Sequence, residues 1–184
     1  MDHIQYAFLA NAVDSSGSRL REYKILFYES RSKKPSLLEV APKSSATYKS
    51  CSLCLVKPHV VAEGNVGSII QAILNEMDIS ACQKISFTKQ DCAEFLQSYS
   101  FLPRFSDHIE EMASGACYAI EVRGSEGIVS KLRAFAGPYD AVIAKELAPD
   151  SLRARFGRNT IQNAVHITDL ETDGTIECAF AFDA

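Results

Sequence analysis

The stretch Cys51-Ser52-Leu53-Cys54-Leu55-Val56-Lys57-Pro58-His59 combines a continuous apolar run with a Lys-Pro pair that ends it. A short apolar run bounded by proline is typical of a buried strand. Gly64 and Asn65 suit the start of a helix, Asn65 to Met77, whose apolar residues recur at helical spacing: Val66, Ile69, Ile70, Ile73, Leu74 and Met77. The stretch therefore predicts the first strand and the first helix of an α/β domain.

Beyond Met77, strand-like and helix-like segments continue to alternate. The pattern predicts strands at Ile79–Phe87, Ala116–Val122 and Thr175–Phe182, and helices at Lys89–Gln97, Ser106–Gly115 and Ser125–Ala136. Thr88 is expected to cap the first of these helices, with Asp91 in a capping box, and Ser106 the second. The order β-α-β-β-α-β, with paired helices between strands two and three, predicts an α/β (α+β) fold: a ferredoxin-like, mainly antiparallel sheet with helices on one face. The long segment between Gly137 and Thr175 has little strand character, and such connections are usually functional.

Residues 1–50 differ in character from the rest of the chain. Gln5–Val13 and Arg21–Tyr28 are β-type runs, and the turn signal Asp14-Ser15-Ser16-Gly17-Ser18 between them predicts a hairpin. A third short run, Leu37–Val40, precedes a polar linker. The prediction is a small amino-terminal β appendage at 1–50, which leans on the domain at 51–184 or on a partner because three short strands bury little surface.

Composition excludes several classes of protein. The chain has 184 residues, 47% of them hydrophobic, which is enough for a packed core. A net charge of -4 and a pI near 5.6 provide no basic field for nucleic acid, so no nucleic-acid partner is expected. The apolar runs are too short to span a bilayer, and residues 1–20 show no signal-peptide pattern. We expect a soluble, cytoplasmic protein without a membrane partner.

The six cysteines allow two interpretations. Cys51 and Cys54 have the spacing of a redox or zinc half-site, but no second pair with ligand spacing follows. The remaining cysteines fall singly inside apolar patterns. We expect reduced, mostly buried thiols.

The candidate chemistry centres on the run Asn163-Ala164-Val165-His166, which follows Arg153 and, farther upstream, Lys57. A neutral imidazole can attack phosphorus directly, and the resulting phosphohistidine is reactive enough to pass the group on. Neighbouring cations stabilise the charge that develops on the migrating phosphoryl group. The alternative for any single histidine is a structural hydrogen-bonding role, which we expect for His3 and His108.

The chain from Cys54 to Asp183 resembles the nucleoside diphosphate kinase family. The resemblance rests on an ordered set of motifs: Val56-Lys57-Pro58, Gly64-Asn65-Val66-Gly67, Met112-Ala113-Ser114-Gly115, Leu152-Arg153 and Asn163-Ala164-Val165-His166. Within the family the chain most resembles the axonemal, microtubule-associated, seventh-type homologue, through Val56–His59, Phe135–Pro138 and Ile161–His166. Tyr6–Ala10 and Leu20–Tyr28 look like a shortened version of the DM-ten segment that precedes the kinase domains in that type.

The resemblance implies a role for each matched residue. His166 would be the phosphate-accepting nucleophile, and Glu177, at the start of the last predicted strand, the carboxylate that fixes its ring. The matches to the family's phosphate and ribose binders are Lys57, Arg133, Arg153 and Asn163. The substrates would be nucleoside di- and triphosphates. Magnesium would be held mainly by the nucleotide's own phosphates, without a dedicated protein metal site.

The chain also departs from the family pattern near this site. Leu96 stands where the family has a tyrosine, and Tyr139 replaces a phosphate-contacting threonine. Arg104 takes the place of the phenylalanine that stacks on the base, with Phe105 one residue out of place. His59 replaces an aspartate, and Ile167-Thr168 replaces Gly-Ser. Arg104 can still stack through its guanidinium plane, but losing an aromatic platform costs on the order of 1 kcal/mol or more.

Two functions therefore remain open from the sequence. One is a nucleoside diphosphate kinase with weak binding and slow turnover. The other is a structural component of a microtubule assembly in a cilium or flagellum axoneme, docked through its amino-terminal strands onto tubulin or an axonemal neighbour. The basic stretch Arg31–Lys34 is either a solvated turn or a contact to such an acidic surface. Oligomeric state and base preference stay open.

Overall fold

The computed structural model describes residues 4–9, 12–13, 19–20, 24–29 and 44–182, with side chains from 44 to 182. Strand β1 (Ile4–Leu9) pairs antiparallel with β4 (Lys24–Glu29), and β2 (Ala12–Val13) with β3 (Arg19–Leu20). The predicted hairpin is therefore confirmed. The run Leu37–Val40 lies outside the described residues, and the division of the chain at residue 50 stays a prediction.

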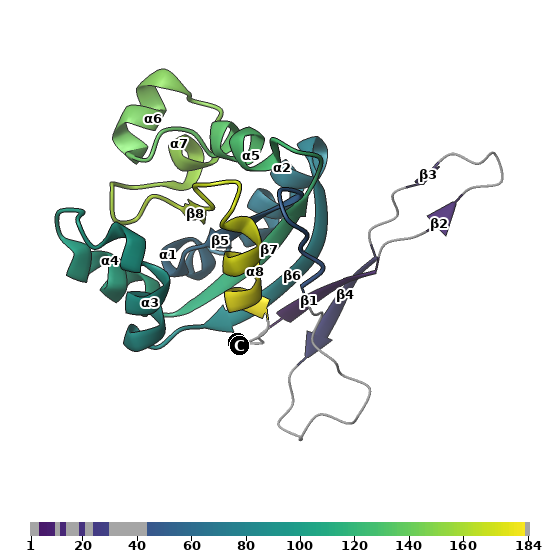
Figure 1. Ribbon diagram of the computed structural model, residues 1–184, viewed down its shortest axis with the longest axis horizontal. Coiled ribbons are helices and arrows are strands. Elements are labelled where there is room, and N and C mark those ends of the chain that lie inside the picture. The colour runs from purple at the N-terminus through teal and green to yellow at the C-terminus, as the bar shows by residue number, and fades with distance from the viewer. Residues whose placement is uncertain (1–3, 10–11, 14–18, 21–23, 30–43, 183–184) are drawn as a thin grey trace.

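A four-stranded antiparallel sheet forms the centre of the main domain (Figure 1). Its strands are β5 (Cys51–Val56), β6 (Asp78–Ser86), β7 (Ala116–Arg123) and β8 (Val165–Ile167). They lie in the order β6-β7-β5-β8, so β5 is central and all six of its residues are buried, as the continuous apolar run predicted. This is the predicted ferredoxin-like topology.

Helices connect and cover these strands. They are α1 (Pro58–Ala62), α2 (Val66–Glu76), α3 (Lys89–Phe95), the 3₁₀ turn η1 (Gln97–Tyr99), α4 (Phe105–Met112), α5 (Ile128–Ala136), α6 (Ala141–Leu147), α7 (Leu152–Phe156) and α8 (Gly174–Phe182). Helices α2, α3 and α5 form where the apolar spacing placed them, within a few residues at their ends.

Apolar side chains on both faces of the sheet are covered by helices (Figure 1). Because successive strand residues point to opposite faces, Cys54 and Val56 pack with α2 and α5, while Leu53 and Leu55 pack towards α3, α4 and α8. The prediction placed the helices on one face. It holds for α2 and α5, but it left out the second layer formed by α3, α4 and α8.

Local sequence signals predicted the start of one helix correctly and the start of another incorrectly. Thr88 caps α3 as predicted: its hydroxyl accepts from the Asp91 amide, and the Asp91 side chain accepts from the Thr88 amide. The predicted Ser106 cap is wrong, because α4 already begins at Phe105. Its N-cap is Arg104, which has left-handed backbone angles (φ 61°) and forms no side-chain cap.

The last predicted strand is also wrong. Thr175–Phe182 lies in α8, whose buried residues Gly174, Cys178, Ala181 and Phe182 recur at helical spacing. The alternation of Ile176, Cys178, Phe180 and Phe182 resembles a strand because helices and strands share short apolar patterns. The fourth strand is β8, inside the segment that was predicted to be a loop.

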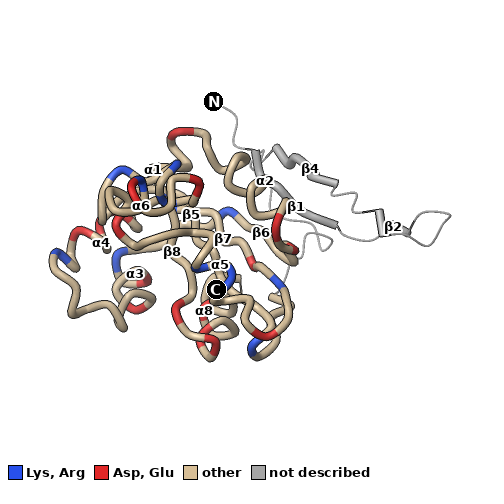
Figure 2. Tube along the Cα trace, turned by 90° about the horizontal axis from the view of Figure 1, so that it is seen from above, with Lys and Arg blue, Asp and Glu red and all other residues tan. Residues whose placement is uncertain are grey.

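All six cysteines are buried and free, as predicted. Burial raises the pKa of the Cys82 thiol to about 12. Figure 2 shows Lys and Arg interspersed with Asp and Glu along the described part of the chain. No helix in the described part of the chain is long and apolar enough to cross a membrane.

Candidate functional site

His166 occupies the middle of β8 and faces the layer that contains α3 and α8. Its register partner is Leu55 on β5, and its ring is buried at 8% exposure. Nε2 of His166 lies 3.1 Å from Oε2 of Glu177, in the first turn of α8. A carboxylate accepts a hydrogen bond, so this contact places the proton on Nε2 and leaves the lone pair of Nδ1 free.

Glu177 is itself held in place by Thr168. The Thr168 hydroxyl donates to Oε2 of Glu177 (2.8 Å) and accepts from the Leu53 amide (2.9 Å), which ties the pair to the central strand. Burial tends to raise the pKa of Glu177, but His166 and the two hydrogen bonds outweigh it and lower the pKa. Glu177 is therefore ionised at neutral pH. The sequence treated Thr168 only as a departure from the family and missed this contact.

Aromatic rings surround the His166 imidazole. Phe95 meets it edge-on at 4.9 Å between centroids and Tyr99 at 5.9 Å. The Tyr99 hydroxyl donates to Asp169, and Asp169 also forms an ion pair with Arg133. Leu96, at the family's tyrosine position, lines the same pocket. Tyr99 was missed because it lies three residues beyond that position, although its ring, like that of Phe95, contacts His166.

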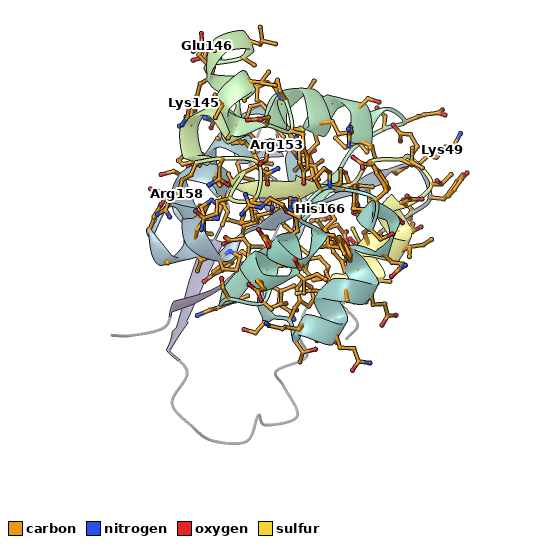
Figure 3. All side chains as sticks on the ribbon, turned by 90° about the vertical axis from the view of Figure 1, so that its left-hand side faces the viewer. Lys49, Lys145, Glu146, Arg153, Arg158 and His166 are labelled. Carbon is orange, nitrogen blue, oxygen red and sulfur yellow. The ribbon has the colours of Figure 1, made fainter. Side chains whose placement is uncertain are left out.

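Two buried cations lie beside the histidine (Figure 3 labels Arg153 and His166). Lys57 follows β5, and its ammonium donates to the Ile161 carbonyl (2.8 Å). Arg153 in α7 donates to the carbonyls of Gly137 (2.8 Å) and Val165 (3.3 Å). Burial lowers the pKa of Lys57 to about 8 and that of Arg153 to about 10.

Asn163 and Tyr139 form the wall next to Arg153. The Asn163 side chain donates to the Tyr139 carbonyl (3.0 Å), and the Arg153 guanidinium lies 5.5 Å from the centre of the Tyr139 ring. The Tyr139 hydroxyl is 3.4 Å from Nδ1 of His108 on α4. His108, which the sequence assigned a structural role, thus lines the pocket, and burial lowers its pKa.

These side chains enclose one pocket. It is lined by Lys57, Leu96, Tyr99, Leu102, Phe105, His108, Met112, Tyr139, Arg153, Asn163, Val165, His166, Ile167 and Asp169. Its cavity volume of about 40 Å³ holds a few water molecules, so a nucleotide requires its walls to move apart. Two buried polar atoms of the pocket, Nε of Arg153 and Oδ1 of Asn163, have no hydrogen-bond partner among the described residues. Such atoms are costly unless a ligand or water satisfies them.

The structure brings together most of the predicted residues, but not all. Arg104 is exposed and pairs with Asp107, while Phe105 takes the place in the pocket. The left-handed conformation of Arg104 accounts for the one-residue offset between sequence position and pocket. Arg133 does not line the pocket directly, and its guanidinium contacts the pocket through Asp169.

The fold and site thus combine a ferredoxin-like sheet, a buried histidine–carboxylate pair and two buried cations that line the same pocket as the histidine. A sequence model of the nucleoside diphosphate kinase family matches residues 50–184. The chain therefore belongs to the nucleoside diphosphate kinase family.

Individual relatives agree with this assignment. Nucleoside diphosphate kinase homolog 7 of Rattus norvegicus is 36% identical over 175 residues, which cover 94% of this chain and 42% of the rat protein. The chain thus spans less than half the length of that relative. The nucleoside diphosphate kinase of Aquifex aeolicus is 32% identical over 132 residues, which cover 71% of this chain and 92% of the bacterial protein. A crystal structure of the Aquifex aeolicus protein superposes with a TM-score of 0.67 at 31% identity, over 71% of this chain and 93% of that one.

Proposed function

We propose that the chain transfers the terminal phosphate of a nucleoside triphosphate to a nucleoside diphosphate through a phosphohistidine at His166. The observation that carries this proposal is the buried Nε2–Glu177 contact beside two orphaned polar atoms, Nε of Arg153 and Oδ1 of Asn163. One is a donor that suits a phosphate oxygen, and the other is an acceptor that suits a ribose hydroxyl. Membership of the kinase family supports the same substrates.

The chemistry follows from the position of the free nitrogen. The Nδ1 lone pair of His166 attacks the terminal phosphorus, the Nδ1–P bond forms, and the bond to the bridging oxygen breaks. The electron pair of that bond leaves with the nucleoside diphosphate. A second nucleoside diphosphate then attacks the phosphohistidine, which restores the imidazole. Glu177 stabilises the positive charge on the ring in both steps.

Cations of the pocket support the transfer. Lys57 and Arg153 would lie next to the phosphates and stabilise the charge that spreads over the equatorial oxygens. No cluster of three metal-binding side chains occurs among residues 44–182. We propose that magnesium enters with the substrate, bound to its phosphates. Arg133 would reach the phosphates after releasing Asp169, which makes binding weaker than for a preformed cation site.

The proposal is tested by labelling the protein with ATP that carries a radioactive terminal phosphate, in the presence of magnesium. We expect an acid-labile, base-stable phosphoprotein that loses its label when a nucleoside diphosphate is added. Glu177→Gln keeps the shape of the side chain but removes its charge, so labelling is expected to slow by about 10²-fold. Glu146→Gln, at an exposed position on α6, serves as control and leaves the rate unchanged. Measurable nucleotide binding without any label in the unmodified protein would contradict the proposal.

A structural role in a microtubule assembly of a cilium or flagellum is the second candidate. The segment before Ser50, which this role would use, lies outside the kinase region and is part of the match to rat homolog 7, which covers 94% of the chain. Those residues include the basic stretch Arg31–Lys34, which suits an acidic surface such as that of tubulin.

Cosedimentation of the full chain with microtubules tests this second role. Replacing Arg31, Lys33 and Lys34 with glutamate is expected to lower the bound fraction several-fold at low salt, because the reversed charges repel an acidic partner. Replacing three exposed basic residues of the domain, Lys89, Lys145 and Arg155, with glutamate changes the net charge by the same amount in the other part of the chain and serves as the control. Equal sedimentation of all three proteins would argue against docking through this stretch.

A further inference from the structure

A buried histidine–carboxylate pair, His59 and Glu111, lies outside the lining of the His166 pocket. Glu111, in the last turn of α4, places Oε1 2.6 Å from Nδ1 of His59, and its Oε2 accepts from Nε2 of Gln162 at 3.0 Å. His59 and Glu111 are both at least 90% buried. His59 stands where the family in general has an aspartate, so this pairing is not part of the general family pattern. Since neither residue lines the pocket, they can affect the site only through a residue that contacts them and also lines the pocket.

Lys57 is that neighbour. It precedes Pro58-His59 in the chain, and its ammonium donates to the carbonyl of Ile161, the residue next to Gln162. Asn159 stabilises the loop that contains Ile161 and Gln162: its side-chain oxygen accepts hydrogen bonds from the amides of Ile161 (2.9 Å) and Gln162 (2.8 Å). Glu111 therefore contacts His59, two residues after Lys57, and Gln162, which follows the residue whose carbonyl accepts the Lys57 hydrogen bond.

We propose that Glu111 is a positioning residue for Lys57: through His59 and Gln162 it fixes the Ile161 carbonyl, and it supplies the negative charge that keeps the Lys57 ammonium in its cationic form. Lys57 then presents its remaining N–H groups to the pocket. The consequence for phosphoryl transfer rests on the proposed function, whereas the effect on Lys57 itself does not.

Electrostatics support this geometry. Burial is the main cause that lowers the pKa of Lys57 to about 8, and Arg153 lowers it further, while Glu111 is the leading influence in the opposite direction. Burial raises the pKa of Glu111, but hydrogen bonds from His59 and Gln162 outweigh it and leave the pKa at about 2. Glu111 is thus ionised throughout the neutral range.

The direction of the pH effect follows from these charges. Lys57 is cationic below a pH of about 8 and loses its charge above it, so without Glu111 the loss occurs at lower pH. The other titratable or charged groups that act on or sense Lys57 are Arg153 on α7, Cys117 on β7 and His108 on α4. The pocket that Lys57 lines also contains Tyr99, Tyr139, His166 and Asp169. Arg153 and Cys117 have pKa values of about 10 and 12, so they stay in one form while Lys57 titrates.

Glu111→Gln tests the proposal, because it keeps the size of the side chain and removes its charge. Glu110→Gln is the matched control: it is the adjacent residue, it is exposed, and it pairs with Lys89 outside the pocket. The readout is a titration of the lysine ¹³Cε signals by NMR, with the Lys57 signal assigned from a Lys57→Arg variant. We expect the Lys57 midpoint near pH 8 in the unmodified protein and in Glu110→Gln, and about one pH unit lower in Glu111→Gln.

The same variants are then compared in the labelling assay as a function of pH. In Glu111→Gln the alkaline loss of labelling should move down by the same pH interval, while labelling at about pH 6 stays within a few-fold. An unchanged Lys57 midpoint in Glu111→Gln overturns the inference, whatever the labelling shows. Absence of label in the unmodified protein overturns the proposed function instead, and the NMR titration still decides the role of Glu111.

A second variant covers the case in which Glu111→Gln does not fold. Gln162→Ala removes the contact between Glu111 and the loop without leaving a buried charge unpaired. It is expected to slow labelling several-fold at every pH while the Lys57 midpoint stays near 8. Labelling equal to that of the unmodified protein would refute the positioning of the Ile161 carbonyl by Glu111.

Discussion

His166→Ala is expected to abolish the acid-labile label, a loss of at least about 10³-fold in phosphorylation rate. Nδ1 of His166 is the one imidazole nitrogen of the pocket that is both left free by a carboxylate contact on the opposite nitrogen and flanked by Lys57 and Arg153. Nucleotide binding should persist within a few-fold, because the cations and Asn163 remain. The measurement is the labelling assay together with equilibrium binding of a fluorescent nucleotide.

The pocket contains a second histidine that sharpens this test. His108 lies against Tyr139 with Nδ1 3.4 Å from the hydroxyl, and no carboxylate among residues 44–182 forms a hydrogen bond with its ring. It therefore lacks the support that Glu177 gives to His166. Label that survives in His166→Ala but disappears when His108→Ala is added would transfer the role of nucleophile to His108. Loss of nucleotide binding along with the label would instead mean that the histidine mainly shapes the pocket.

Gly174→Ala is expected to lower the free energy of unfolding by about 3 kcal/mol. A Cβ at this position would lie 2.3 Å from the Cys51 carbonyl oxygen, far inside van der Waals contact. Cys51 pairs with Arg123 on β7, and the same strand β5 is also held by β8 at Cys54–Val56, so Cys51 cannot move away cheaply. The helix that begins at Gly174 would have to shift instead, and with it Glu177.

Chemical denaturation and thermal unfolding measure this effect, with a drop of roughly 6 to 12 °C in Tm. Gly67→Ala is the matched control, because a Cβ there meets nothing within 4 Å and the residue lies inside α2. Alanine in a helix is favoured over glycine by about 0.5 to 1 kcal/mol, so the control should be slightly stabilised. A Gly174→Ala protein as stable as the control would show that α8 does not approach β5 so closely.

Much of the fold could be predicted because its signals are local. The continuous apolar run made β5 recognisable, the spacing of Ile69, Ile70 and Ile73 indicated α2, and Thr88 with Asp91 marked the start of α3. Each of these features depends on residues within one or two turns of each other. Such patterns can be identified without knowing what packs against them.

The fourth strand could not be found in this way. β8 has only three residues, and its pairing with β5 involves Leu55 and His166, which are far apart in the chain. Thr175–Phe182 offered a longer apolar alternation and was mistaken for the strand. Once β8 occupies the sheet edge next to β5, the apolar residues of α8 are buried by packing across the face of the sheet.

The site, too, has a part that the sequence could predict and a part that depended on the tertiary structure. The order of motifs along the chain was enough to place Lys57, Arg153, Asn163 and His166 in one pocket and to predict Glu177 as the partner of the histidine. Which side chains complete the pocket depended on contacts between distant segments: Phe105 in place of Arg104, Tyr99 against His166, Asp169 on Arg133, and His59 with Glu111. A sequence motif contains residue types at fixed spacing, but it does not give the direction of each side chain. That direction depends on backbone angles, such as the positive φ of Arg104, and on the packing of helices that meet only in the folded chain.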